Sequence, residues 1–169
     1  RRATTGKTQD NLQAAFAGES QANRKYLAFA KKADDEGHAQ LAKLFRAAAA
    51  AETVHAHNHL RTMGGVKTTA ENLQEAISGE NHEVVSMYPE FIKEAEAEGV
   101  KAAQNTFRWA WEVEKVHEAL YRKASDNLGK STESFDYYVC QVCGYTHEQS
   151  APDKCPVCGA PAARFDRVG

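Results

Sequence analysis

The chain has 169 residues, enough for one sizeable domain and a small additional module. Its formal net charge is −2, with acidic and basic residues interspersed, which argues against an electrostatic nucleic-acid binder. No apolar run approaches the ~18–20 residues that span a bilayer, and the polar start RRATTGKTQD lacks the pattern of a signal peptide. We therefore expect a cytoplasmic protein with no nucleic-acid or membrane partner.

Residues 8–128 are predicted to form four helices. This segment is rich in Ala, Glu, Lys, Gln and Leu, and its apolar positions recur at alternating helical spacings. Gly37, the pair Gly64 and Gly65, and Gly99 supply breaks at which a helix can end. The predicted helices are 6–36, 38–63, 70–98 and 100–128. Short turns within the first and second pairs indicate two antiparallel hairpins and an all-α four-helix bundle.

The two predicted hairpins are related by an internal repeat. DNLQAAFAGES at 10–20 matches ENLQEAISGEN at 71–81 with an offset of 61, and FRAAAAAETVH at 45–55 matches FRWAWEVEKVH at 107–117 with an offset of 62. The second copy thus has one extra residue between its matched blocks, where Pro89 also lies. We predict a kink or π-bulge around 84–89.

The repeat pairs two E-x-x-H motifs. Glu and His three residues apart share one face of a helix, and the motif at 52–55 recurs at 114–117. Glu80 is the counterpart of Glu19, whereas Glu83, one turn after Glu80, has none. These Glu and His residues lie near the middle of the four predicted helices, on the faces that carry the apolar residues. We therefore expect their side chains to converge inside the bundle. The candidate ligands are Glu19, Glu52, His55, Glu80, Glu83, Glu114 and His117.

Five carboxylates on the inner face of a bundle require compensation. Desolvating each charge costs several kcal/mol, which bound metal ions would offset. One Glu from each of two helices and an E-x-x-H motif from each of the other two form the ligand pattern of di-iron and di-manganese proteins. The alternative is a set of solvated helix positions, which the matched motifs disfavour. Trp109 and Trp111 flank the fourth helix's stripe and are interpreted as packing residues.

A second metal site is predicted after Leu128, where the composition changes. The polar segment GKSTES is followed by an aromatic cluster and by two C-x-x-C units, Cys140 with Cys143 and Cys155 with Cys158. About 35 residues bury too little apolar surface to fold unaided, so a metal clamp is expected. The spacing suits a tetrahedral four-sulfur site, which iron and zinc both accept. The FDYYVC lead-in and the di-metal bundle favour iron.

Taken together, these motifs resemble the rubrerythrins over essentially the whole chain. AGESQANRKYLAFAKKADDEG, AETVH, SGENHEVVSMYPEFIKEAEAEG and EVEKVH resemble the family's helices in order, and YYVCQVCGYTHEQSAPDKCPVCGAP resembles its rubredoxin-like domain. The resemblance implies a ferritin-like di-iron bundle at 1–130, a linker at 131–134 and a mostly β Fe(Cys)4 domain at 135–169. Zinc is possible at the cysteines in recombinant material.

The resemblance also implies roles for the candidate residues. Glu52 and Glu114 would bridge two non-haem irons, and Glu83 and His117 would hold one of them. The other iron would keep Glu19 and move between His55 and Glu80 with redox state. Tyr26 and Tyr88 match tyrosines that hydrogen-bond the ligand carboxylates. With Glu83, they are the candidate catalytic residues.

The activity implied is reduction of hydrogen peroxide to water in oxidative-stress defence. Electrons would come from NAD(P)H through a separate rubredoxin-type reductase or another donor, and would pass through Fe(Cys)4. A head-to-tail homodimer is also implied, with one subunit's Fe(Cys)4 beside the partner's di-iron site. Two alternatives remain open from the residues alone, namely iron oxidation and storage, and redox or metal sensing by the cysteine module.

Overall fold

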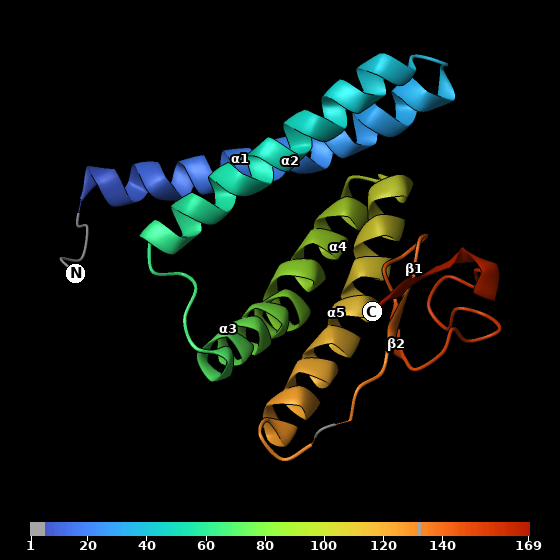
Figure 1. Cartoon of the computed structure of the whole chain (residues 1–169). Helices are drawn as coiled ribbons and strands as arrows, with labels where there is room; N and C mark the ends of the chain where they lie inside the picture. The colour runs from blue at the N-terminus through green and yellow to red at the C-terminus, as the bar shows by residue number, and fades with distance from the viewer. Residues whose placement is uncertain (1–5, 132) are drawn as a thin grey trace. The chain divides into compact units, whose positions relative to one another are not determined.

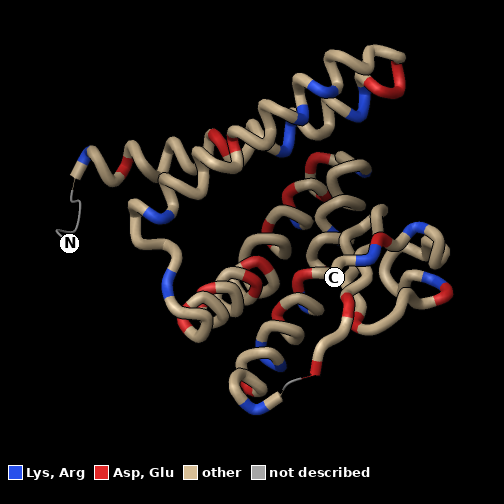
Figure 2. The backbone as a smooth tube through the Cα atoms, in the orientation of Figure 1, with Lys and Arg blue, Asp and Glu red and all other residues tan. Residues whose placement is uncertain are grey.

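The structure is a computed structural model that describes residues 6–131 and 133–169 (Figure 1). Residues 1–5 of the predicted bundle and residue 132 of the predicted linker lie outside the described residues. The chain divides into two compact units, one ending at Lys67 and one beginning at Thr68. Figure 2 shows acidic and basic residues interspersed along the helices within 7–62 and 101–127, whereas acidic residues predominate along the helices within 69–97. In the part of the chain that is described, no helix is both long and apolar enough to cross a membrane.

The first unit is a hairpin of α1 (Lys7–Asp35) and α2 (Ala39–Thr62). The turn between them passes through Gly37, whose φ of 80° is the left-handed conformation that glycine adopts without strain. The buried residues of the two helices are small: Ala30, Ala33, Ala42, Ala49 and Ala56. Because alanine side chains are short, the two backbones can approach closely along this seam.

The second unit begins with a helix in three parts: α3 (Thr69–His82), the π-helix η1 (Glu83–Met87) and α4 (Tyr88–Ala97). Thr68 and Glu71 form a capping box that satisfies backbone N–H groups at its start. After Gly99 the chain returns as α5 (Lys101–Asn127). The predicted helix spans 70–98 and 100–128 therefore agree closely with the structure.

The π-helix confirms the predicted bulge and accounts for the extra residue of the second copy. Before it, Glu80 corresponds to Glu19 at an offset of 61, and after it Tyr88 corresponds to Tyr26 at an offset of 62. A π turn takes up one residue more than an α turn, so the flanking helix keeps its packing face. The aromatic clusters of the two copies match in their ring-centroid distances, although the tilt of the rings differs. The Tyr26–Phe29 and Tyr88–Phe91 centroids are both 6.3 Å apart, and the Phe29–Phe45 and Phe91–Phe107 centroids are both 5.6 Å apart.

The remainder of the second unit is a small antiparallel sheet. Its strands are β1 (Tyr137–Cys140), β2 (Thr146–Glu148) and β3 (Phe165–Val168), in the order β2-β1-β3. A single 3-10 turn, η2 (Ala162–Arg164), precedes β3. The predicted fold class is confirmed: a mostly helical N-terminal part with four helices is followed by a small sheet that carries the four cysteines.

Candidate metal centres

The described residues contain three groups of side chains whose ligand atoms lie within 4.8 Å of one another. The first cluster lies on the α1–α2 hairpin and the second on α3 and α5, and each has two carboxylates and one imidazole. The third consists of the four cysteines. The members are Glu19, Glu52 and His55; Glu80, Glu114 and His117; and Cys140, Cys143, Cys155 and Cys158.

The first cluster shows how the E-x-x-H spacing works locally. Glu52 and His55 are one turn apart on α2, and Nδ1 of His55 lies 2.9 Å from Oε2 of Glu52. Glu19 comes from α1 and completes the group. Asn23, one turn after Glu19 on α1, connects the two helices beside this cluster. Its side-chain amide donates to the Ala49 carbonyl oxygen at 2.7 Å and to Thr53 Oγ1 at 2.8 Å, both on α2.

The second cluster has the same arrangement and strongly altered acidities. Nδ1 of His117 lies 2.7 Å from Oε2 of Glu114 and 3.9 Å from Oε1 of Glu80. Burial, with the adjacent carboxylate of Glu114, raises the pKa of Glu80 to about 7. Burial also acts to raise the pKa of Glu114, but hydrogen bonds with His117 and Glu80 outweigh it and hold that pKa below its usual value. The hydrogen bond with Glu114 raises the pKa of His117.

Glu83 lies outside the three groups but is electrostatically close to the second cluster. It is the first residue of η1, so its side chain leaves the helix at the point where the π-helical segment begins. Burial and then the negative charge of Glu114 raise its pKa. This interaction is consistent with the asymmetry predicted from the repeat, since Ala22 stands at the matching position of the first copy.

The two candidate tyrosines lie in different surroundings. Tyr88 packs against Phe91 and Phe107, and burial followed by the charges of Glu83, Glu114 and Glu80 raises its pKa. It therefore lies near the carboxylates of the second cluster. Tyr26 packs against Phe29 and Phe45 within the first unit. The predicted hydrogen bonds from these two hydroxyls to ligand carboxylates remain predictions.

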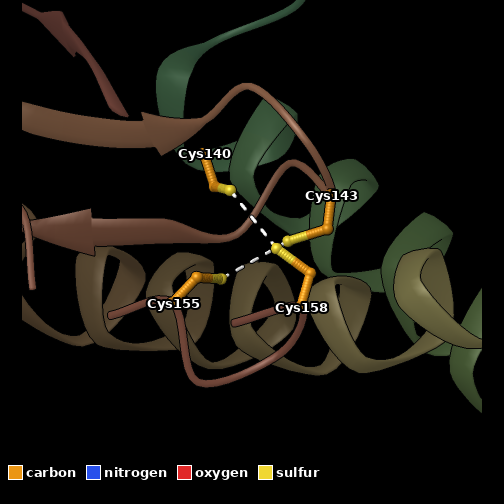
Figure 3. Close-up of side chains that lie close together, drawn as sticks. All are labelled: Cys140, Cys143, Cys155 and Cys158. Carbon is orange, nitrogen blue, oxygen red and sulfur yellow. Dashed lines mark hydrogen bonds between the residues drawn. The ribbon is translucent and has the colours of Figure 1, made fainter. Parts of the chain in front are cut away.

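The four cysteines converge from two turns of the small domain (Figure 3). All four are free thiols, and Sγ of Cys140 lies 3.6 Å from Sγ of Cys158, while Sγ of Cys143 lies 3.5 Å from Sγ of Cys155. Around a tetrahedral metal with bonds of about 2.3 Å, sulfur atoms would be about 3.8 Å apart. The spacing therefore fits a single metal ion held by four thiolates.

Backbone N–H groups support these thiolates. Burial raises the pKa of the Cys143 and Cys158 thiols, and one backbone hydrogen bond to each opposes that rise: the Tyr145 N–H donates to the Cys143 sulfur and the Ala160 N–H donates to the Cys158 sulfur. The turns that aim them pass through Gly144 and Gly159, whose φ angles are 86° and 79°. Because glycine adopts such angles without strain, the residue after each second cysteine lets the backbone fold back over the sulfur.

The family of the chain follows from its similarity to known proteins. The family model described as Rubrerythrin matches residues 10–125, and the one described as Rubrerythrin, rubredoxin-like domain, matches residues 138–166. The chain belongs to the rubrerythrin family. Members of this family are in general di-iron proteins of the peroxidase type that act in oxidative stress.

Individual relatives agree along almost the full length. Rubrerythrin-2 of Clostridium acetobutylicum is 33% identical, over 94% of this chain and 95% of its own. Rubrerythrin of Porphyromonas gingivalis is 37% identical, over 95% of this chain and 89% of its own. The structure of nigerythrin in its fully reduced, all-ferrous state is similar with a TM-score of 0.59 and 33% identity, covering 99% of this chain and 89% of that one.

The donor sets fit the cofactors expected for the family. The four clustered cysteines form the Fe site of the rubredoxin-like domain, and the carboxylate and histidine clusters of the helices are consistent with a di-iron site. Carboxylate oxygens with one imidazole per cluster suit iron in preference to softer metals.

Sequence patterns missed two hydrogen bonds beside these clusters. His117 Nε2 lies 2.9 Å from Thr146 Oγ1 in β2, and the Trp111 indole N–H donates to the Val84 carbonyl oxygen at 2.8 Å. The interpretation of Trp111 as a packing residue is thus incomplete. A fuller comparison of the two repeat copies would have pointed to Trp111. Trp111 aligns with Ala49 and Val84 aligns with Asn23, and Asn23 and Ala49 are themselves joined by a hydrogen bond in the first copy. Nothing in the sequence indicates the contact of Thr146.

Proposed function

We propose that this protein is a di-iron peroxidase that reduces hydrogen peroxide to water, with electrons reaching the di-iron centre through Fe(Cys)4. The observation that carries the proposal is the pair of matched carboxylate–histidine clusters, Glu19–Glu52–His55 and Glu80–Glu114–His117, in a chain that also holds a four-cysteine cluster. The family membership supports the same reaction class.

The two clusters would together hold two irons. Glu52 and Glu114 would bridge them, Glu83 and His117 would hold one, and Glu19 would hold the other together with His55 or Glu80, according to redox state. When bound, the two ferrous ions supply the two electrons that, with two protons, convert one hydrogen peroxide into two water molecules.

The chain's own residues would orient the substrate and move protons. The half-buried Tyr88 hydroxyl, whose pKa burial and the nearby carboxylates raise further above its usual value, is protonated at neutral pH and can donate a hydrogen bond or a proton beside the carboxylates. Tyr26 would act in the same way from the first hairpin. Glu83, which has no counterpart in the first copy, gives one iron a ligand that the other lacks.

The electron supply and the assembly are part of the proposal. We propose that a separate NAD(P)H-linked rubredoxin-type reductase, or another small donor, reduces Fe(Cys)4, and that the protein is a cytoplasmic homodimer. The domain division into 1–130, a linker at 131–134 and 135–169 is supported by the end of α5 at Asn127 and the start of β1 at Tyr137.

A coupled assay tests this function. Peroxide-dependent NADH oxidation is measured with a generic rubredoxin reductase for the wild type and for Glu83→Ala, Cys158→Ser and Glu112→Ala. Glu83→Ala removes an iron ligand and Cys158→Ser removes the electron carrier, so both should lower turnover about 100-fold or more. Glu112 pairs with Lys115 on an exposed part of α5, and its replacement should leave turnover unchanged.

The same assay separates the competing functions. Steady consumption of peroxide is expected of a peroxidase and not of a sensor or a storage protein. Full turnover in both Glu83→Ala and Cys158→Ser would refute the assignment. A red solution that dithionite bleaches and peroxide reoxidises would show directly that Fe(Cys)4 is coupled to a second centre.

A further inference from the structure

Thr146, the first residue of β2, contacts a candidate metal ligand on α5. Nε2 of His117 lies 2.9 Å from Oγ1 of Thr146, and Nδ1 of the same ring lies 2.7 Å from Oε2 of Glu114. The two nitrogens of this imidazole therefore face different parts of the second unit. Nδ1 faces the carboxylate cluster, and Nε2 faces the four-cysteine domain.

The hydrogen count of this contact fits a metal-bound histidine. A neutral imidazole carries one N–H, so when Nδ1 coordinates a metal the proton is on Nε2 and is donated to Thr146 Oγ1. The Thr146 hydroxyl then uses its own hydrogen toward the Gly144 carbonyl oxygen, which lies 3.2 Å away. Every donor in this chain of contacts has an acceptor.

The four-cysteine domain fixes the position of Thr146. Thr146 pairs with Val139 in the β1–β2 ladder, and the Cys140 N–H donates to the Tyr145 carbonyl oxygen at 2.9 Å. Gly144, the acceptor of the hydroxyl, directly follows the ligand Cys143. The hydroxyl is thus attached to the first metal-binding turn, and it depends on the same turn for its orientation.

A second contact holds β2 against α5. Nζ of Lys123 lies 2.5 Å from Oε2 of Glu148 at the other end of β2. This ion pair is exposed, so its contribution to stability is modest. It nevertheless anchors the strand on the helix that carries His117 and shows that the Thr146 contact is not isolated.

We propose that Thr146 is a positioning residue for His117, holding the imidazole so that Nδ1 points at the metal of the second cluster. The inference rests on the proposed role of His117 as an iron ligand. Metal-bound histidines commonly donate their second N–H to a fixed acceptor, and loss of that acceptor weakens metal binding about 10–100-fold. One consequence is that an intact four-cysteine domain supports the metal affinity of the helical cluster in the same chain.

The first cluster provides an internal comparison. His55 is the repeat counterpart of His117, and Glu52 is its hydrogen-bond partner among the described residues. The repeat ends with the helices and contains no counterpart of Thr146. The support from Thr146 is therefore specific to His117 and makes the two otherwise matched clusters unequal.

The test measures metal affinity in the full chain with one equivalent of Zn²⁺ in the four-cysteine site. Co²⁺ is titrated into the helical sites and followed by visible absorption, for the wild type, Thr146→Val, Thr146→Ser and Thr62→Val. Thr146→Val should weaken binding at one helical site about 10-fold or more. Thr146→Ser keeps the hydroxyl and should bind as the wild type does. Thr62→Val removes an exposed hydroxyl at the end of α2 and is the matched control.

A second measurement gives a decisive result in the wild type itself. In the fully Zn²⁺-loaded wild type, the His117 Nε2–H should give an NMR signal that is protected from solvent exchange. The protection should persist in Thr146→Ser and disappear in Thr146→Val. Rapid exchange of this proton in the wild type would overturn the proposal even if Thr146→Val failed to fold.

The ligand assignment and the positioning role can fail separately. If Glu114→Ala binds Co²⁺ as the wild type does, the assignment of the second cluster as a metal site is wrong. If Glu114→Ala loses Co²⁺ at that site but Thr146→Val retains full affinity and a protected Nε2–H, the positioning role alone is wrong. Neither result depends on peroxidase activity.

Discussion

At Glu80 the fold changes the acidity of a single carboxyl group enough to matter at neutral pH. Its pKa rises from 4.5 to about 7, because the side chain is partly buried and shares its surroundings with Glu114. The pKa of His117 also rises, chiefly through its hydrogen bond with Glu114. The protein without metal therefore holds protons in this cluster that a bound cation would displace.

The stability of the metal-free protein should consequently fall as the pH rises. Both groups bind protons more tightly in the folded than in the unfolded state, so their contribution is complete at low pH and is lost as the pH passes through the raised pKa values. We expect the free energy of unfolding of chelator-treated protein, measured with denaturant, to decrease between about pH 5 and pH 8. Metal affinity should increase over the same range.

Glu80→Gln provides the decisive variant for this prediction. The amide does not ionise, so the decrease in the free energy of unfolding with pH should be much smaller than in the wild type. Glu112→Gln, which alters an exposed carboxylate of α5, should leave the wild-type dependence intact. An unchanged dependence in Glu80→Gln would contradict the assigned cause.

At the scale of the helices, each hairpin has a side chain on one helix that donates to a backbone carbonyl oxygen of the other, at matching positions of the repeat. The donor is on the first helix of one hairpin and on the second helix of the other. In the first, the Asn23 side chain on α1 donates to the Ala49 carbonyl oxygen of α2. In the second, the Trp111 side chain on α5 donates to the Val84 carbonyl oxygen at the matching position. Val84 lies in η1, where the π turn interrupts the regular pattern of backbone hydrogen bonds. The indole N–H thus holds the segment that begins with Glu83.

Trp111→Phe should loosen this π-helical segment. Phenylalanine keeps an aromatic ring in place but removes the N–H, and one such hydrogen bond contributes about 1 kcal/mol. Hydrogen–deuterium exchange of amides 83–88 in the metal-free protein should therefore become about 5-fold faster. Trp109→Phe, two residues earlier on α5, is the matched control. Equal exchange in wild type and Trp111→Phe would show that packing alone holds η1.

At the scale of the whole molecule, the question is which di-iron centre each Fe(Cys)4 serves. The family resemblance implies the centre of the partner subunit. Within the second unit, however, the four-cysteine domain lies against its own α5 through the contacts of Thr146 and Glu148 with His117 and Lys123. We therefore expect Fe(Cys)4 to deliver electrons to the second cluster of its own chain.

Mixed dimers distinguish the two routes. Cys158→Ser chains have intact helical clusters and no electron carrier, whereas Glu114→Ala chains have the carrier and a broken second cluster. If electrons stay within one chain, heterodimers isolated with two different affinity tags should have no more peroxidase activity than the two parent variants. Recovery of a substantial part of wild-type activity would show transfer between subunits. Size-exclusion chromatography with light scattering checks that dimers form at all.

Much of this protein could be predicted from local patterns. Helix boundaries followed from apolar spacing and glycine breaks, and the π-helix followed from the one-residue difference between two repeat offsets. The clusters on α2 and α5 followed from the E-x-x-H spacing, because residues one turn apart on a helix necessarily share a face. The cysteine site followed from two C-x-x-C units, since each turn brings its own pair of sulfurs together.

Residue spacing is thus enough to predict which residues share each candidate ligand face, because helical geometry depends only on spacing along the chain. The acidity of Glu80, the contact of Trp111 with Val84 and the contact of Thr146 with His117 emerge only in the folded chain. Each of these depends on burial or on a hydrogen bond between elements far apart in sequence, and no periodic pattern encodes such a pairing. The difference between the two matched histidines therefore lies in packing that the repeat does not share.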